Sequence, residues 1–212
     1  MKTGDTIIDS QKLTWTITQS LGRGLWGRSW LARNSEGREA VIKTSLAASD
    51  FPKDIPLPDG LANACGQCLR EQFTLLESAK FPFLPKLEGL ATLADGRRAL
   101  ILTRYRSRSL TGDEMPMDEV LQRLLQVVEA LQKNGRTHGN LRPSNILWNE
   151  RDEPVLTDLL TPTANKIRAW SLSFSPERNW DVPPEAQGYP VPVWDTWALC
   201  LYLYRSLTTS QE

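Results

Sequence analysis

One stretch of this sequence decides how the rest is interpreted: His138-Gly-Asn-Leu-Arg-Pro-Ser-Asn-Ile-Leu147. It contains the only histidine of the 212-residue chain. Apolar residues with helical spacing precede it, from Val120 to Leu131, and the helix that they predict ends at Asn134-Gly135, a typical helix C-cap. The stretch therefore follows directly on a predicted helix, in a helix-led second half of the chain.

The first half of the chain is predicted to be mainly strands, because its apolar residues have the spacing of strands. Turn residues separate them, at 34–37 and at Asp95-Gly96. A helical pattern with Phe73 and Leu76 on one face covers 69–78. Strands are predicted at 13–21, 29–33, 39–44 and 99–104, with one more before Asp95. We expect an α+β fold of two lobes, residues 1–104 with a five-stranded sheet and one helix, and residues 105–212 with mainly helices.

The charge balance excludes several classes of partner. The chain has 25 Lys and Arg against 25 Asp and Glu, so no bulk charge favours nucleic acid or an anionic membrane. Residues 1–10 lack the pattern of a signal peptide, and no apolar run approaches the roughly 20 residues of a membrane span. A cytoplasmic protein without nucleic-acid or membrane partners is expected.

The chain has three cysteines, two of them in Cys65-Gly-Gln-Cys68. This spacing is that of half a zinc site or of a redox pair. Cys200 and the single histidine are distant in sequence, so four zinc ligands are hard to assemble. Reduced thiols at the start of a helix are the alternative that we favour.

A glycine cluster, Gly22-Arg-Gly-Leu-Trp-Gly27, lies between two predicted strands. Alone it fits a plain hairpin as well as a phosphate-binding loop. A dinucleotide fold would require a helix directly after the glycines, whereas here a strand follows, so the loop would cover a ligand as a flap. Lys43 ends the next strand, in Ala40-Val-Ile-Lys43; a lysine there either neutralises phosphates or is a solvated edge residue.

Residues 138–147 resemble the catalytic loop H-R-D-L-K-P-x-N-I-L of protein kinases in seven of ten positions. Further motifs follow the order of that family: the glycine loop and strand lysine before it, Asp158-Leu-Leu160 in place of D-F-G, Val182-Pro-Pro-Glu185 in place of A-P-E, and Asp195 at the start of helix F. The chain is therefore similar to eukaryotic-type (Hanks-type) serine/threonine protein kinases over about residues 15–210.

The resemblance implies a bilobal protein-kinase-like fold, truncated after helix F, that binds ATP and Mg²⁺. Glu71 would pair with Lys43, with Glu77 as the fallback, and the backbone from Arg104 to Arg106 would bind adenine. The implied catalytic positions are Asn140, Lys43, Glu71 and Arg142; the implied nucleotide-binding residues are Gly22, Gly24, Trp26, Gly27, Ala40, Lys43, Thr103 (as gatekeeper), Arg104, Arg106 and Leu147; the implied metal ligands are Asn145 and Asp158.

The chain departs from the family at several of these positions. Asn140 replaces the aspartate that accepts the hydroxyl proton, and an amide can neither take that proton nor carry the charge. Leu160 replaces the D-F-G glycine, whose backbone freedom helps the aspartate to turn towards metal. Gly139 replaces an arginine that reads an activation-loop phosphate, so no such switch is expected. With few helices to cover helix F, Trp197, Leu201 and Tyr204 are expected to be poorly buried.

Three functions are compatible with this pattern. The first is an ATP- and magnesium-binding pseudokinase that acts as a scaffold or allosteric partner of another protein. The second is a serine/threonine kinase that phosphorylates a protein substrate, with its aspartate replaced by Asn140 naturally or by engineering. The third is an interaction module that binds no nucleotide. The joint presence of four residues argues against it: Lys43, Glu71, Asn145 and Asp158.

Overall fold

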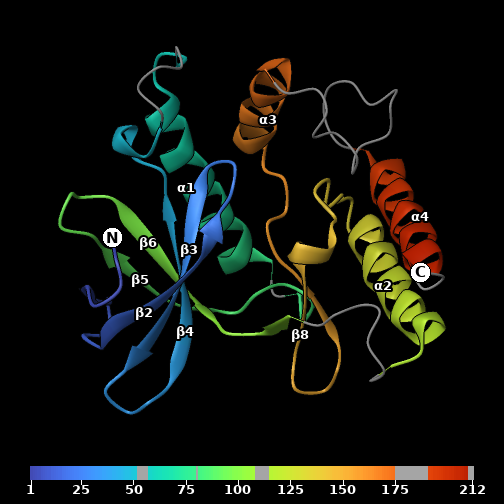
Figure 1. Cartoon of the computed structure of the whole chain (residues 1–212), viewed down its shortest axis with the longest axis horizontal. Coiled ribbons are helices and arrows are strands. Elements are labelled where there is room, and N and C mark those ends of the chain that lie inside the picture. The colour runs from blue at the N-terminus through green and yellow to red at the C-terminus, as the bar shows by residue number, and fades with distance from the viewer. Residues whose placement is uncertain (52–56, 80, 108–114, 175–190, 210–212) are drawn as a thin grey trace. The chain divides into compact units, whose positions relative to one another are not determined.

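The computed structural model describes residues 1–51, 57–79, 81–107, 115–174 and 191–209, which fold into two compact units (Figure 1). The first unit comprises Met1–Lys80, Pro85–Arg104 and Thr161–Ser171, and the second comprises Phe81–Leu84, Tyr105–Leu160 and Leu172–Glu212. A division at residue 104 would assign segment 81–84 to the first unit and segment 161–171 to the second. In the structure, 81–84 belongs to the second unit and 161–171 to the first.

A six-stranded antiparallel sheet forms most of the first unit, one strand more than the sequence predicts. The additional strand is β1, which the polar N-terminal residues did not indicate. The strands are β1 (Thr6–Ile8), β2 (Thr14–Arg23), β3 (Gly27–Asn34), β4 (Glu39–Ser45), β5 (Leu87–Thr92) and β6 (Arg98–Thr103), in the spatial order β1-β2-β3-β4-β6-β5. A bridge between Asp9 and Ala91 and a hydrogen bond of 2.7 Å from the Ser10 amide to the Leu90 carbonyl join its two edges, so the sheet is strongly curled.

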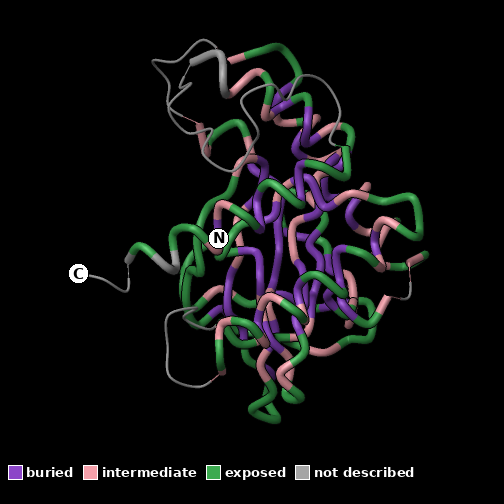
Figure 2. Tube along the Cα trace, turned by 90° about the vertical axis from the view of Figure 1, so that its right-hand side faces the viewer, coloured by how far each residue is buried: buried purple, intermediate pink, exposed green. Residues whose placement is uncertain are grey.

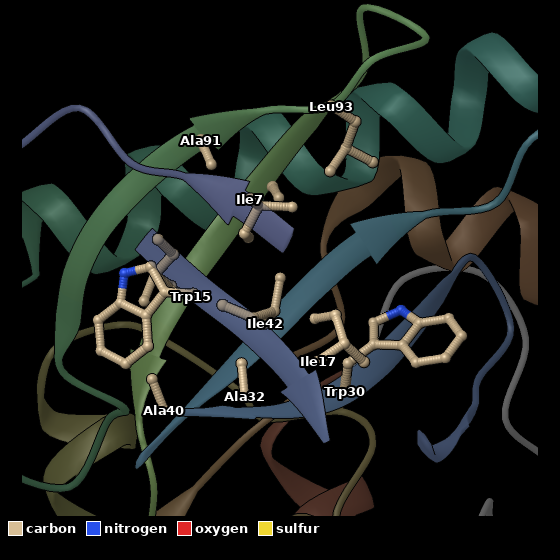
Figure 3. Close-up of a cluster of buried hydrophobic side chains, with 11 residues drawn as sticks. Ile7, Trp15, Ile17, Trp30, Ala32, Ala40, Ile42, Ala91 and Leu93 are labelled. Carbon is tan, nitrogen blue, oxygen red and sulfur yellow. The ribbon is translucent and has the colours of Figure 1, made fainter. Parts of the chain in front are cut away.

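The inner face of this curled sheet carries a core of buried apolar side chains. Strand alternation supplies them, since every second residue of each strand points to the same face. Trp15 is fully buried there and donates its indole N–H to Asp9 Oδ2 over 2.9 Å. The cluster consists of Ile7, Trp15, Ile17, Trp30, Ala32, Ala40, Ile42, Ala91, Leu93, Ala99 and Ile101 (Figure 3). Figure 2 shows the buried residues concentrated along the strands.

Two helices complete the first unit. Helix α1 (Leu61–Ser78) packs against β4, β5 and β6 and begins eight residues before the predicted one. Its buried stripe is Leu61, Cys65, Cys68, Leu69 and Gln72, whereas Phe73 and Leu76 are only half-buried, which corrects the predicted face. Helix α3 (Pro162–Phe174) occupies part of the expected activation segment, where the sequence predicted no helix.

The second unit combines a small sheet with two helices. Its strands are β7 (Arg106–Ser107), β8 (Ile146–Trp148) and β9 (Pro154–Leu156), in that spatial order. Helix α2 (Met117–Lys133) packs against β9 and against α4 (Pro192–Thr209), and a 3₁₀ turn covers Pro143–Asn145. Within the predicted stripe of α2, Leu125 is exposed and Val127 takes its place. Trp197 and Tyr204 of α4 are exposed, as expected, whereas Leu201 is half-buried.

The end of α2 confirms the predicted C-cap. Gly135 adopts a φ of 66°, the left-handed region that glycine enters at little cost. Its amide donates to the Gln132 carbonyl over 2.9 Å, and the Arg136 amide donates to the Leu131 carbonyl over 3.0 Å. This pair of bonds is a Schellman motif, which satisfies the last carbonyls of the helix and directs the chain towards His138.

None of the helices in the described part of the chain combines the length and apolar character needed to cross a membrane.

Candidate functional site

Lys43 lies buried on β4 in the first unit, with 6% of its surface exposed. Burial lowers the pKa of its ammonium group to about 7, because the charged form loses its hydration. Its Nζ atom lies 4.7 Å from the centre of the Trp26 ring, a cation–π contact that favours the charged form. A lysine in this setting is not a solvated edge residue, because its ammonium group is buried and its pKa is lowered.

The glycine loop joins β2 to β3, and β3 pairs with β4, the strand that carries Lys43. The Gly24 amide donates to the Gly27 carbonyl over 2.8 Å and closes the turn. Gly27 faces Thr44 so closely that a Cβ atom on it would lie 2.7 Å from the Thr44 carbonyl oxygen. Gly22 has a φ of 145°, which side chains rarely allow. Trp26, predicted to cover the phosphates, is instead buried, with its ring against Lys43.

The strand register corrects two predicted nucleotide-binding residues, Ala40 and Thr103. Ala40 lies in the inner core with Ile42, so strand alternation places it on the face opposite to Lys43. Thr103 pairs directly with Ala40 and shares its face, and its hydroxyl donates to Glu88 over 2.5 Å. The face of Lys43 instead carries Val41 and, on β6, Leu100 and Leu102. The strand phase of the motif Ala40-Val-Ile-Lys43 could have revealed this from the sequence.

Glu71 contacts the start of α3. Its Oε1 atom accepts a hydrogen bond of 2.6 Å from the Thr163 hydroxyl, and its Oε2 atom accepts one of 3.2 Å from the Thr163 amide. Gln67 adds a longer contact of 3.4 Å. The expected pairing with Lys43 therefore stays a prediction, as does the fallback Glu77, which is exposed. The buried polar residue of α1, which sequence analysis did not single out, is Gln72.

In the second unit, Asp195 and His138 hold the loop 138–147. Asp195 is buried at the start of α4, and its carboxylate accepts the amides of His138 at 2.7 Å and Gly139 at 2.8 Å. Burial raises the pKa of Asp195, against the lowering effect of these two amides. Gly139 has a φ of 68°, so the backbone here favours glycine over the arginine common in kinases.

The neutral His138 ring links two parts of the second unit, Thr157 and Asn140, through hydrogen bonds. Complete burial lowers its pKa to about 3, although a bond to Thr157 opposes the shift. Its Nε2 atom lies 3.0 Å from the Thr157 carbonyl, and its Nδ1 atom lies 3.3 Å from the Asn140 amide. A neutral ring with the proton on Nε2 satisfies both contacts, because it donates to the carbonyl and accepts from the amide. The chain's only histidine is thus structural.

Asn140, at the position of the missing aspartate, uses both ends of its amide. Its Nδ2 donates to the Asp158 carbonyl over 3.0 Å. Its Oδ1 accepts from the Arg142 guanidinium, at 2.5 Å from Nη2 and 3.2 Å from Nε. A donor facing a carbonyl and an acceptor facing a guanidinium fix the orientation of the amide. Neither end is a proton acceptor of the strength that a general base requires.

The two predicted metal ligands lie next to this asparagine. Asn145 is buried, and its Nδ2 donates to the Asn140 carbonyl over 2.8 Å, which leaves Oδ1 as its ligand-type atom. Asp158 adopts a φ of 62°, whereas Leu160 has no positive φ and donates its amide to the His138 carbonyl over 2.9 Å. The left-handed residue is therefore Asp158, so this backbone does not require glycine at 160.

The amide oxygen of Asn145 and the carboxylate of Asp158 are the hard oxygen donors that Mg²⁺ prefers. No cluster of three or more His, Cys, Asp or Glu side chains suited to a metal occurs among the described residues. These two donors resemble the Mg²⁺ sites of nucleotide-binding proteins. There the protein supplies one or two ligands, and phosphate and water fill the remaining positions.

The remaining predicted residues have mainly surface roles. Arg104 forms an ion pair with Glu39 in the first unit. Arg106 contacts Asp152 Oδ1 at 2.9 Å in the second unit. Leu147 is half-buried in the middle of β8. The proposed role of the backbone from Arg104 to Arg106 stays a prediction. The motif Val182–Glu185 lies outside the described residues.

Cys65 and Cys68 do not have the character of a reactive pair. Both are buried in α1, and burial raises their pKa values, to about 11 for Cys65 and about 12 for Cys68. At neutral pH both are protonated thiols, whereas metal binding and redox exchange require the thiolate. The alternative of reduced, structural thiols is favoured.

Comparison with known proteins relates this geometry to protein kinases. No family model matches the sequence. The chain is 33% identical over 86 residues to a receptor protein kinase-like protein of Arabidopsis thaliana, an alignment that covers 37% of the chain and 11% of the relative. It is 26% identical over 156 residues to Serine/threonine-protein kinase C of Synechocystis sp., covering 68% of the chain and 28% of that protein.

The fold has a counterpart among solved structures. The chain "PpkA-294 apo form" superposes with a TM-score of 0.69 and 18% identity, over 97% of the present chain and 78% of the other. The chain spans about a tenth and about a quarter of the two curated relatives. Together, the sequence similarities and the shared fold make this chain protein-kinase-like.

Proposed function

We propose that this chain is a protein-kinase-like domain that binds ATP with Mg²⁺ and is impaired in phosphoryl transfer. It would act in the cytoplasm as a scaffold or allosteric partner of another protein. The observation that carries the proposal concerns Asn140. Its side-chain amide forms hydrogen bonds with the Asp158 carbonyl and with Arg142. The surrounding loop, in contrast, keeps the residues that nucleotide binding requires.

Each retained residue has a task in nucleotide binding. Lys43 would neutralise charge on the α- and β-phosphates, and its lowered pKa makes it responsive to them. The Gly22–Gly27 loop brings backbone amides near phosphate, because glycines allow a close approach. Asn145 and Asp158 would hold Mg²⁺, which when bound supplies positive charge at the phosphate oxygens. Arg142, held by Asn140, places a further positive charge in the loop 138–147.

The impaired step is the activation of the acceptor hydroxyl. Phosphoryl transfer depends mainly on positioning and charge, and a base that orients the hydroxyl contributes roughly 10²- to 10⁴-fold. The amide of Asn140 can accept a hydrogen bond from a hydroxyl but cannot take up its proton. Its Oδ1 is in addition occupied by Arg142. We expect slow transfer or none, with nucleotide binding intact.

Isothermal titration with MgATP tests the binding part of the proposal. Replacing Lys43 by Met should weaken binding at least about tenfold, since a hydrogen bond to a charged group contributes about 1.5–3 kcal/mol. Lys133→Met is the matched control, because this exposed lysine of α2 forms an ion pair with Glu129 on the same helix. If the unmodified chain binds no nucleotide, the third reading, an interaction module without nucleotide, replaces this proposal.

A serine/threonine kinase whose aspartate is replaced by Asn140 remains the second candidate. It is supported by the sequence around Asn140, His138-Gly-Asn-Leu-Arg-Pro-Ser-Asn145, which otherwise follows the catalytic-loop pattern. The two candidates differ in whether Asn140→Asp restores transfer to a protein hydroxyl.

A further inference from the structure

Two arginines flank the turn of the glycine loop in the first unit. Arg23 ends β2, Arg28 is the second residue of β3, and the two are directly opposite each other in the β2–β3 register. Like charges at directly opposed positions of neighbouring strands repel each other, because the two side chains point to the same face and lie close together. The pair therefore becomes favourable only where negative groups compensate it.

The described residues supply less negative charge at this place than the arginines require. Asp50 Oδ1 lies 3.1 Å from Arg28 Nη2, and the same carboxylate is shared with Arg97, at 3.9 Å from its Nη1 atom. Arg97 also pairs with Asp95 at 2.7 Å. Arg23 has no carboxylate partner in the described part of the chain. Three arginines thus share two carboxylates.

Arg23 is accessible from outside the fold. The residue is exposed, and its guanidinium lies over the Phe51 ring, 5.5 Å from the ring centre, next to the 3₁₀ turn η1 (Ala48–Asp50). Burial raises the pKa of Cys65, Arg23 lowers it and Asp50 raises it further, so both charges act near the start of α1. That end of α1 has no side-chain cap and no acidic residue in its first turn, so its positive dipole end is not offset there.

Two buried N–H donors on one face of β3 have no acceptor in the described part of the chain. They are Arg28 Nε and Trp30 Nε1. Strand alternation places both side chains on the face of the inner core, where Trp30 lies beside Ile17 (Figure 3). A buried donor without an acceptor costs free energy that a bound acceptor recovers. Arg28 is therefore satisfied on one side by Asp50 and has an unused donor on the other.

This face of the glycine hairpin is opposite to the face of Lys43. Lys43 pairs with Ser29 in the β3–β4 register, whereas Arg28 pairs with Thr44. Successive residues of a strand point to opposite faces. An anion between Arg23 and Arg28 is therefore distinct from the nucleotide phosphates proposed at Lys43.

We propose that Arg23 and Arg28 form a second anion site, which binds a phosphate monoester on a phosphorylated side chain of a protein partner. Such a group carries roughly 1.5 to 2 negative charges at neutral pH and three acceptor oxygens, which match two planar guanidinium groups. One oxygen accepts the unused Nε–H of Arg28, and Arg23 contacts the group from the exposed side. The inference deepens the proposed function, on which it rests for the existence of a partner, and assigns the chemistry that recognises that partner.

Side-chain NMR signals report on this site directly. Proton–nitrogen correlation spectra contain the Arg28 Nε–H and the Trp30 indole N–H, which are assigned by their loss in Arg28→Lys and Trp30→Phe. The probes are inorganic phosphate and blocked phosphoserine, with blocked serine as the control, all at constant ionic strength. We expect both phosphate probes to shift the Arg28 signal, the Trp30 signal to follow with the same midpoint, and blocked serine to shift neither.

Two variants and a control locate the binding. Arg23→Gln removes the exposed guanidinium and should weaken binding of blocked phosphoserine at least about tenfold. Arg28→Lys keeps the charge but loses the planar fork, and it should weaken binding to a similar extent, as followed by the Trp30 signal. Arg33→Gln is the matched control, because this exposed arginine of β3 forms an ion pair with Glu39; it should bind as the original chain does.

Three results would overturn the inference. No shift of the Arg28 signal with either phosphate probe means that water suffices as the acceptor of its Nε–H. Binding of inorganic phosphate without binding of blocked phosphoserine identifies an adventitious ion only. Equal affinity of Arg23→Gln and the original chain places the probe elsewhere.

A titration with MgATP separates this inference from the proposed function. We expect MgATP and blocked phosphoserine to bind together, because their sites lie on opposite faces of the hairpin. If the chain binds blocked phosphoserine but no MgATP, the nucleotide part of the proposed function fails and the second anion site stands. If MgATP displaces blocked phosphoserine and Arg23→Gln weakens both equally, the arginine pair belongs to the nucleotide site and the inference fails.

Discussion

Lys43 is the residue whose charge the proposed nucleotide binding requires, and burial lowers its pKa to about 7. A bound triphosphate favours the ammonium form and raises this pKa again. At about pH 8 the free side chain is mostly neutral, so binding of MgATP should take up about one proton, whereas at about pH 6 the uptake should nearly vanish. Titration calorimetry in two buffers of different ionisation enthalpy measures this number. Equal uptake at both pH values would show that Lys43 does not titrate on binding.

The same shift affects stability. The pKa of Lys43 is lower in the folded chain than in the unfolded chain, where it is near 10.5. The unfolded state therefore binds more protons between about pH 7 and pH 10, and the contribution of Lys43 makes folding more favourable as the pH rises through that window. Lys43→Met should remove this part of the pH dependence, as measured by urea unfolding at several pH values.

Asn140 is matched to its surroundings as an amide. In Asn140→Asp at neutral pH, a carboxylate oxygen would face the Asp158 carbonyl that Nδ2 now contacts. We expect a loss of about 1–2 kcal/mol in the free energy of unfolding, partly offset by a stronger contact with Arg142. The loss should shrink below about pH 4, because a protonated carboxyl can donate to the carbonyl again. A variant as stable as the original chain at neutral pH would contradict this assignment of the amide.

At the scale of the elements, two glycines offer a matched pair of substitutions. Gly135 ends α2 with a φ of 66°, and Ala there should cost about 1 kcal/mol through backbone strain alone, since nothing lies within 4 Å of its Cβ position. Gly66 lies inside α1, and a Cβ there meets only the Arg70 side chain at 3.7 Å. Gly66→Ala should therefore stabilise the chain by about 0.5–1 kcal/mol. The two substitutions should therefore change the free energy of unfolding in opposite directions. Changes of the same sign would refute the description of one of these two positions.

Sequence patterns predicted the strands β2, β3, β4 and β6 and the helix α2 closely, because their apolar periodicity and turn residues are clear. They missed β1, whose single buried apolar residue, Ile7, gives no alternation to detect. They missed α3 because its first turn depends on Glu71, a residue distant in the sequence. The assignment of Ala40 followed a motif rather than the phase of its strand, and that phase places Ala40 in the inner core.

For the molecule as a whole, the sequence indicated candidate residues for the proposed chemistry, and the structure adds the contacts that hold them. Asp195 and His138 order the loop around Asn140, and Trp26 lies against Lys43. The engagement of Asn140 by Arg142 and the cap that Glu71 forms on α3 arise from tertiary contacts, which no local pattern encodes.

The measurement that tests the central claim most directly is γ-phosphoryl transfer from MgATP, to the chain itself and to a generic basic protein, with Asn140→Asp assayed in parallel. We expect the chain to bind nucleotide but to transfer phosphate at background rate. A gain of about 10²-fold or more in Asn140→Asp would identify a kinase that lacks only its base, and no gain would favour the scaffold. Transfer by the unmodified chain at a rate equal to that of Asn140→Asp would contradict the claim that this domain is impaired.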